Sequence, residues 1–273
     1  MSMLRALRTL PFAAAVRTSR ATTLSPSRTM ATAIGTRVEH AKRVLERADA
    51  VCFDVDSTVI TSEGIDDLAD FLGCGEVVAA LTKAAMDGGK PFHEALAERL
   101  AAMNPTKQQL DEMMEKHPLQ LTPGVKELIA TLHRREQHVY FVSGGFRQMI
   151  QPIAKMVDVP TTHIYANTLL FNDDGSFKGH LESEPTSRAG GKAKVVADLK
   201  ALHGYINVVM VGDGATDMEA RDIPGGADAF IGFGGIASRE KVKAGADWFV
   251  TEFQDVIDVL NKVGVAGSWH EAP

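Results

Sequence analysis

Short apolar runs, each followed by glycine or polar residues, constrain the fold of this chain more than any other feature. The runs are three or four residues long and rich in β-branched and aromatic residues, which is typical of buried strands. They are Ala50–Phe53, Val139–Val142, Val208–Val211, Ala229–Ile231 and Trp248–Val250. Amphipathic helical stretches lie between several of them, for example Gly124–Arg134 and Lys192–His203. This alternation predicts an α/β fold, a Rossmann-like, mostly parallel sheet with helices on both faces.

One segment, residues 63–121, interrupts the alternation. It contains no strand-like run, and Thr106 with Gln109 three residues later forms a capping-box pattern. Its helical stretches are Glu76–Ala85, Phe92–Met103 and Lys107–His117. We therefore expect a small helical cap domain of residues 63–121, inserted after the first strand. The α/β core then comprises residues 37–62 and 122–273. A hairpin is also expected within Thr161–His180, with its turn at Asn172–Gly175.

The first 36 residues differ from the rest in charge. They contain no acidic residue but several arginines, with many Ser, Thr and Ala residues. This composition is typical of an organelle transit peptide, and we interpret residues 1–36 as a disordered leader. A chloroplast or other plastid is the expected destination; a mitochondrion is the alternative, or the cytosol if Met30 serves as the start. A basic tail without a targeting role also fits the composition.

The charge of the chain bears on its partners. The net charge is −6, and the six arginines of residues 1–38, a stretch without any acidic residue, leave −12 for the remainder (−6 − 6 = −12). An acidic body argues against nucleic acid as the main partner. No apolar run reaches the ~18 residues needed to span a bilayer, so we expect no membrane partner. The expected partner is a small molecule.

The strongest chemical signal is DVDSTV, which directly follows the first predicted strand. Asp54 and Asp56 are two residues apart, so their side chains leave the strand end on the same side. Two carboxylates at such a short distance require a nearby cation or a shared proton. A DxD pair alone also occurs in turns and caps, but open α/β sheets bind ligands at the carboxyl ends of their strands.

Three further motifs follow later strands or begin helices. Ser143–Gly145 offers a hydroxyl and backbone N–H groups, and Lys192 follows two glycines at a helix start. GDGATD adds Asp213 and Asp217 after the Val208–Val211 strand. Taken alone, each motif is an ordinary turn or helix start. Together, four acids, a hydroxyl and a lysine at one sheet edge suit Mg²⁺ and a phosphate group.

The four motifs, in this order, resemble those of the haloacid dehalogenase superfamily. Longer segments, among them VCFDVDSTV, SEGIDDLADF, LTPGVKEL, FVSGGFR and VGDGATDMEA, resemble the phosphoserine phosphatase family within it. The resemblance extends over about Ala48 to Leu260. It implies hydrolysis of O-phospho-L-serine through an aspartyl-phosphate, the last step of the phosphorylated pathway of serine biosynthesis. It is also compatible with a homodimer.

The resemblance also implies roles for individual catalytic residues. Asp54 is the nucleophile and Asp56 the general acid and base, while Ser143 and Lys192 hold the phosphoryl group. One Mg²⁺ ion is held by the Asp54 carboxylate, the Asp56 backbone carbonyl and Asp213. Asp217 supports this site from close by.

The implied substrate-binding residues lie partly in the cap. Glu63 binds the ammonium of the substrate and Arg99 its carboxylate. The remaining contacts come from Met86, Phe92, Ser143, Gly144, Gly145, Lys192 and Thr216. From the residues alone, Met86 and Phe92 also fit a core position, and Arg99 a surface pair with Glu98. The family commonly has Gly after the pocket methionine, whereas Asp87 stands there in this chain.

Two alternatives stay open at this point. A related phosphatase or phosphotransferase of the same superfamily would act on another small phosphomonoester, such as phosphohomoserine. A protein of another class would bind Mg²⁺ or a phosphoamino acid without turnover.

Overall fold

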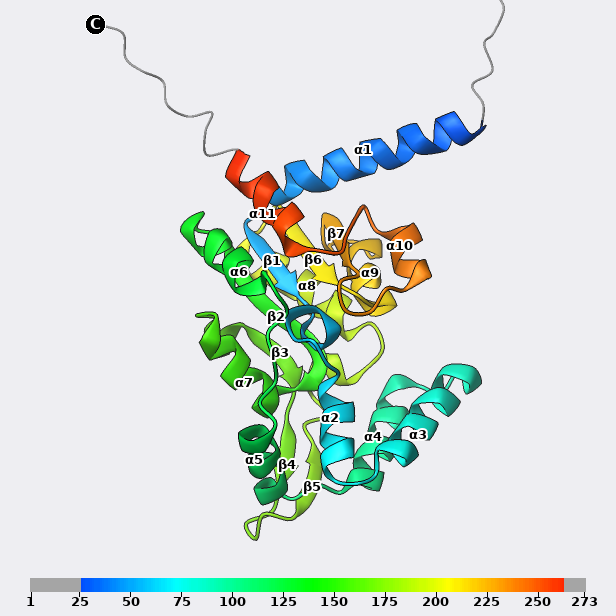
Figure 1. Ribbon diagram of the computed structural model, residues 1–273, viewed down its shortest axis with the longest axis vertical. Coiled ribbons are helices and arrows are strands. Elements are labelled where there is room, and N and C mark those ends of the chain that lie inside the picture. Colours follow the sequence, from blue (N-terminus) through cyan, green and yellow to red (C-terminus); the bar gives the residue numbers. More distant parts are fainter. Residues whose placement is uncertain (1–25, 263–273) are drawn as a thin grey trace, which may run out of the picture.

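A single parallel sheet of six strands forms the centre of the molecule (Figure 1). The computed structural model describes residues 26–262, with side chains from residue 35 onward except those of residues 86–88. The strand order is β3-β2-β1-β6-β7-β8. The strands are β1 (Ala50–Phe53), β2 (His138–Phe146), β3 (Ile164–Asn167), β6 (Val208–Gly212), β7 (Ala229–Phe233) and β8 (Trp248–Val250). This confirms the predicted α/β fold and its five apolar strands.

Helices cover both faces of the sheet. Every residue of β1, β6 and β7 is therefore buried. Along β1, Val51 and Phe53 point into one apolar cluster, and Ala50 and Cys52 into the other. The first cluster is closed by α1 (Pro26–Glu46), α6 (Val125–Arg134), α7 (Arg147–Met156) and α11 (Phe253–Lys262). The second is closed by α8 (Gly191–His203), α9 (Ala215–Asp222) and α10 (Glu240–Gly245). In the described residues no helix is long and apolar enough to cross a membrane.

The region from Thr161 to His180 differs from its prediction. A hairpin is present, formed by β4 (Leu169–Phe171) and β5 (Phe177–His180). The residues before it, however, form β3, a parallel edge strand of the main sheet. β3 is four residues long and pairs with a strand that ends about twenty residues earlier. No local turn pattern therefore marks it in the sequence.

The cap consists of α2 (Gly64–Phe71), α3 (Gly75–Gly88), α4 (Phe92–Met103) and α5 (Lys107–Lys116). The capping box at the start of α5 is confirmed, with Thr106 and Gln109 bonded reciprocally. The apolar cluster of the cap also includes Phe146, Met149 and Leu169. The cap thus packs on the hairpin and on the start of α7, so its packing extends beyond residues 63–121.

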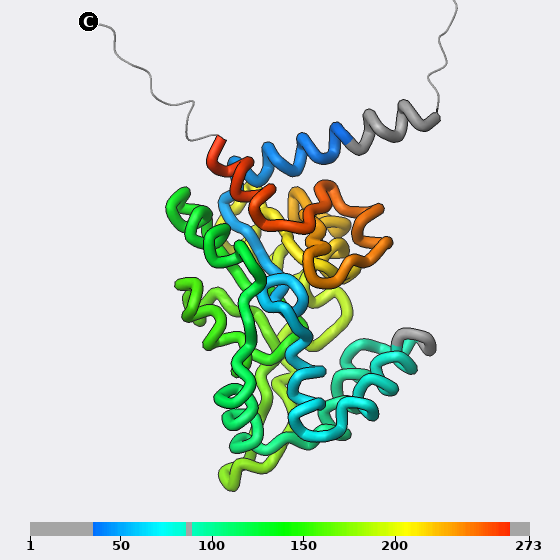
Figure 2. Tube along the Cα trace, viewed as in Figure 1, coloured from blue at the N-terminus to red at the C-terminus, as the bar shows by residue number. Residues whose placement is uncertain are grey.

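The chain leaves the core and returns to it through two adjacent segments, which Figure 2 follows side by side. Ile60 and Leu121 form an isolated antiparallel bridge. The Thr61 amide donates to the Gln120 carbonyl at 3.0 Å, and the Thr122 amide donates to the Val59 carbonyl at 2.9 Å. We call residues 59–63 and 117–122, which contain these pairs and join the core to the cap, the hinge.

The predicted leader lies partly outside the described residues, which begin at Pro26. Its predicted boundary at residue 36 falls inside α1 rather than at a helix end. From residue 35 onward, where burial is described, the first buried residue of α1 is Ala41. The change in charge along the sequence therefore does not coincide with the start of secondary structure.

The packing of α11 generates a stability prediction. Phe253 is 1% exposed, and its ring stacks on Phe233 at a centroid distance of 4.2 Å. Phe253→Ala should lower the free energy of unfolding by about 3–5 kcal/mol through lost burial and a cavity. Ile206→Ala, at a position 75% exposed, should change it by less than about 0.5 kcal/mol. Urea unfolding measures both, and equal effects would contradict the packing described.

Candidate active site

Asp54 lies at the carboxyl end of β1, in the middle of the sheet. Its amide donates to the Val211 carbonyl of β6 at 2.9 Å, which continues the ladder to the edge of the strand. Its Oδ1 accepts the Val55 amide at 2.7 Å, and its Oδ2 lies 2.7 Å from Lys192 Nζ. The residue is only 6% exposed. This carboxylate is therefore buried, oriented by backbone and paired with a cation.

Lys192 links two carboxylates at the start of α8. Its Nζ lies 2.7 Å from Asp54 Oδ2 and 2.7 Å from Asp217 Oδ1. Burial on its own would lower the pKa of Lys192, but the charges of Asp217 and Asp54 reverse this and raise it. Burial, followed by repulsion from Asp54, raises the pKa of Asp217 to about 7. We conclude that Lys192 is charged and that it partly neutralises this group of acids.

Three of the acids meet the requirements of a cation site. Carboxylate oxygens of Asp54, Asp213 and Asp217 lie within 4.8 Å of one another, and all three residues are buried. Hard carboxylate oxygens are the ligands that Mg²⁺ prefers. Burial, with repulsion from Asp54 second, raises the pKa of Asp213. The donor set therefore fits Mg²⁺ in its chemistry.

Asp56 lies beside this group but has different partners. Its Oδ1 accepts the Gly64 amide of the cap at 2.8 Å, and its Oδ2 accepts the Ser143 hydroxyl at 3.3 Å. Burial, with the charge of Asp54 second, raises the pKa of Asp56 to about 7. A carboxyl group with this pKa can donate and accept a proton near neutrality.

The Ser143–Gly145 segment was predicted to follow its strand, but it lies within β2. The register of β2 against β3 shifts between Val142 and Phe146, and α7 begins only after Phe146. Buried Asn167 donates to the Gly144 carbonyl at 2.7 Å and thereby holds the irregular segment. A Cβ on Gly145 would lie 2.6 Å from Asp56 Oδ2, so glycine is required there.

Two of the predicted substrate-binding residues of the cap, Phe92 and Arg99, lie near this region. Phe92 lies next to Gly144, since a Cβ on that glycine would be 3.5 Å from the end of the Phe92 ring. Arg99 is half-buried and lies within electrostatic range of Asp66 and Glu63. Thr216 is exposed in the first turn of α9. The side chains of Met86 and Asp87 lie outside the described residues.

Two residues that the sequence analysis did not single out also belong to this region. Arg239 donates to Asp213 through Nε at 3.0 Å and lies 3.5 Å from Glu63. Ser57 donates to Glu63 at 2.8 Å. No motif in the sequence marks Arg239. It reaches the site only because the loop after β7 returns to it, so it is distant in sequence from its partners there. Ser57 stands inside DVDSTV, and its position beside two aspartates was the available signal.

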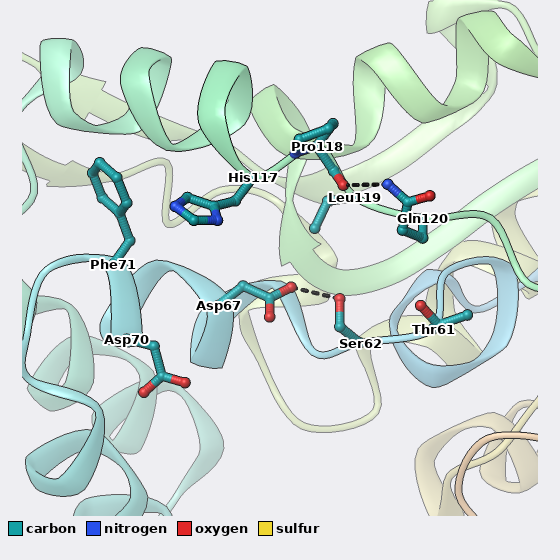
Figure 3. A pocket seen from close by; sticks show the side chains of 9 residues that line it. All are labelled: Thr61, Ser62, Asp67, Asp70, Phe71, His117, Pro118, Leu119 and Gln120. Atoms are coloured by element: carbon teal, nitrogen blue, oxygen red, sulfur yellow. Dashed lines mark hydrogen bonds between the residues drawn. The ribbon is translucent and has the colours of Figure 1, made fainter.

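A separate cavity of about 660 Å³ lies along the hinge (Figure 3). In it, the Ser62 hydroxyl donates to Asp67 at 2.5 Å. The lining residues are Thr61, Ser62, Asp67, Asp70, Phe71, His117, Pro118, Leu119 and Gln120. None of the predicted site residues lines this cavity, so it is distinct from the carboxylate group.

Comparison with known proteins agrees with this geometry. The family model described as haloacid dehalogenase-like hydrolase matches residues 51–221. A protein of Arabidopsis thaliana named "Phosphoserine phosphatase, chloroplastic" is 50% identical over 213 residues, which are 78% of this chain and 72% of that protein. The chain belongs to the phosphoserine phosphatase family of haloacid dehalogenase-like hydrolases.

Solved structures of other proteins share the fold of this chain. A substrate-bound phosphoserine phosphatase complex is 26% identical, with a TM-score of 0.65, and the match covers 77% of this chain and 96% of that one. The structure of DsGPDH of Dunaliella salina is 37% identical, with a TM-score of 0.70. That match covers 80% of this chain but only 37% of the Dunaliella chain. The fold is therefore found both in chains of similar length and as part of a longer one.

Close contact at Gly212 generates a prediction for the site. A Cβ on Gly212 would collide with the Asp217 carboxylate, which bonds both Lys192 and the Gly214 amide. Gly212→Ala should displace Asp217, raise the Mg²⁺ concentration for half-maximal phosphate release and lower kcat/KM about 100-fold. Gly35→Ala is the matched control, because no atom lies within 4 Å of its added carbon. Unchanged Mg²⁺ dependence in Gly212→Ala would contradict the role of this contact.

Proposed function

We propose that this chain is a phosphatase that hydrolyses O-phospho-L-serine to L-serine and phosphate. The observation that carries the proposal is the buried Asp54 carboxylate, paired with Lys192 at 2.7 Å and followed two residues later by Asp56. The family to which the chain belongs supports the same activity. The reaction is the last step of serine biosynthesis by the phosphorylated route.

In the first step, Asp54 attacks the phosphorus atom of the substrate and the bond to the serine oxygen breaks. Asp56 gives its proton to that oxygen, which leaves as the hydroxyl of L-serine. The raised pKa of Asp56, about 7, keeps a protonated fraction ready for this transfer. The product on the chain is an aspartyl-phosphate at Asp54.

In the second step, a water molecule attacks the phosphorus of the aspartyl-phosphate. Asp56, now a carboxylate, accepts a proton from this water, and the bond between phosphorus and the Asp54 oxygen breaks. Phosphate leaves and both side chains return to their starting states. One residue serves as acid and then as base because the second step reverses the proton demand of the first.

Lys192 and Ser143 hold the phosphoryl oxygens, with Gly144 and Gly145 beside them; the Gly145 amide donates to Ser143 Oγ at 2.9 Å. Lys192 is charged, so it offsets negative charge as the phosphoryl group transfers. Asp54, the Asp56 carbonyl and Asp213 would hold one Mg²⁺ ion, supported by Asp217. The ion would neutralise phosphate charge and so permit the approach of a carboxylate nucleophile.

The serine end of the substrate is recognised at the entrance to the cap. Glu63 binds the ammonium and Arg99 the carboxylate, with Phe92, Met86 and Thr216 completing the surroundings. An Arg–carboxylate pair is directional and bidentate, which suits an amino acid end. We take residues 63–121 as the cap domain and residues 37–62 with 122–273 as the core.

We further propose that residues 1–36 direct the chain to a chloroplast or another plastid. The acid-free, arginine-rich composition of this segment and the chloroplastic relative support this destination. The homodimer stays a prediction.

The nucleophile is tested by Asp54→Asn, which keeps the shape of the side chain but removes its charge. Phosphate release from O-phospho-L-serine should fall by about 10⁴-fold or more. EDTA should abolish wild-type release, and added Mg²⁺ should restore it. Asp173→Asn, in the exposed hairpin turn, is the control and should keep full activity.

The outcomes separate the competing readings. If Asp54→Asn is inactive but phosphohomoserine is preferred over O-phospho-L-serine, the mechanism holds and the substrate assignment is wrong. Full activity of Asp54→Asn contradicts the mechanism. A wild-type protein that binds O-phospho-L-serine without turnover is a binding protein.

The recognition of the carboxylate is tested by Arg99→Ala with two substrates. Its kcat/KM for O-phospho-L-serine should fall about 100-fold, because a charge-assisted bidentate pair is lost. With O-phosphoethanolamine, which lacks the carboxylate, the change should stay within about threefold. Arg43→Ala, at an exposed position of α1, is the control. An equal loss with both substrates would show that Arg99 does not read the carboxylate.

A further inference from the structure

Ser57 has a backbone conformation that is uncommon for a side-chain-bearing residue. Its φ is 51° and its ψ is 12°, in the left-handed region that favours glycine. The residue is 4% exposed and lies directly after Asp56. A non-glycine residue in this conformation requires support from its surroundings.

Two hydrogen bonds tie Ser57 to the hinge. Its amide donates to the Ser62 carbonyl at 3.0 Å. Its hydroxyl donates to Glu63 Oε1 at 2.8 Å. The loop that starts at the catalytic aspartates is thus closed onto the first residues of the cap, and the carboxylate of Glu63 is held by a donor from the loop.

Glu63 is oriented by this contact while one of its oxygens stays available. Its side chain is 41% exposed, and Oε1 also lies 3.5 Å from Arg239. Within the described part of the chain, Oε2 has no hydrogen-bond partner. A carboxylate bonded through one oxygen and free at the other is suited to bind an ammonium group.

The groups around Glu63 show why the hydrogen bond from the Ser57 hydroxyl matters for the ionisation of Glu63. Burial raises the pKa of Glu63, and the Ser57 hydroxyl is the strongest influence that lowers it. Asp213 and Asp54 of the core raise it further, and Arg239 lowers it. Arg99 of the cap lies within electrostatic range of Glu63. Two nearby acids therefore oppose ionisation of Glu63, and the hydroxyl counteracts them.

We propose that Ser57 is a positioning residue that holds Glu63 for the substrate ammonium and thereby sets the preference for amino acid phosphates. The proposal rests on the proposed function. Ser57 itself touches neither the phosphoryl group nor the amino acid end in this role. Its effect should therefore depend on whether the substrate carries an ammonium.

The test compares O-phospho-L-serine with 3-phosphooxypropanoate, which keeps the phosphate and the carboxylate but lacks the ammonium. Ser57→Ala should lower kcat/KM for O-phospho-L-serine about 10-fold, mainly through KM, since a hydrogen bond to a charged group is lost. With the analogue, kcat/KM should stay within about twofold of the wild type.

Two further variants separate the hydroxyl from the backbone. Ser57→Gly removes the hydroxyl but suits the left-handed conformation, and it should show the same loss of preference as Ser57→Ala. Ser62→Ala removes a neighbouring hydroxyl that bonds Asp67 rather than Glu63, and it should leave the preference unchanged. Thermal melting confirms that each variant is folded.

Glu63→Gln provides an independent readout. In that background, Ser57→Ala should produce no further loss with O-phospho-L-serine, because the two residues act through one contact. In the Ser57→Ala protein alone, the pKa of Glu63 should rise. Ammonium binding needs the ionised carboxylate. When the pH is lowered, KM for O-phospho-L-serine should therefore begin to increase at a higher pH in Ser57→Ala than in the wild type.

Several outcomes overturn the proposal. An equal loss of kcat/KM with both substrates means that Ser57 supports the catalytic loop in general. An unchanged preference in both Ser57 variants means that Glu63 is oriented without it. A wild type that fails to prefer O-phospho-L-serine over the analogue overturns the substrate assignment as well, and this is seen before any variant is compared.

Discussion

The pairing of Lys192 with two carboxylates is the interaction on which the rest of the site depends. Asp54 and Asp217 both lie 2.7 Å from its Nζ, and Asp213 belongs to the same buried group. Buried like charges at this spacing repel strongly unless a cation is present. The fold brings the lysine from the start of α8, Asp54 from the end of β1, Asp213 from the end of β6 and Asp217 from the first turn of α9. These elements must therefore keep their relative positions.

Close packing around the acids explains why glycines recur in the motifs. At Gly212 a methyl group would overlap the Asp217 carboxylate, and at Gly145 it would approach Asp56 Oδ2. Both carboxylates also accept backbone amides, from Gly214 and Gly64 respectively. Backbone amides therefore orient the carboxylates of Asp217 and Asp56 on one side. On the other side, glycines without a side chain leave just enough room for them. This arrangement restricts their rotamers without using additional side chains.

The sequence predicted the parts of the fold that short-range patterns encode. Buried strands appear as apolar runs, and the start of α5 was marked by its capping box. β3 and Arg239 were missed for a shared reason: each takes its place through partners distant in sequence, β3 through β2 and Arg239 through Asp213. The irregular end of β2 was missed because Asn167, from the next strand, holds it.

Substrate recognition and phosphoryl chemistry are connected through one short loop. Asp54 and Asp56 precede Ser57, and Ser57 bonds Ser62 and Glu63 at the hinge. The Gly64 amide at the start of the cap in turn bonds Asp56. A shift of the cap relative to the core must therefore alter the contacts of Asp56 and Glu63 together. The proposed proton donor, Asp56, and the proposed ammonium-binding carboxylate, Glu63, are consequently positioned by the same ten residues of chain, 54–63, rather than by two independent parts of the fold.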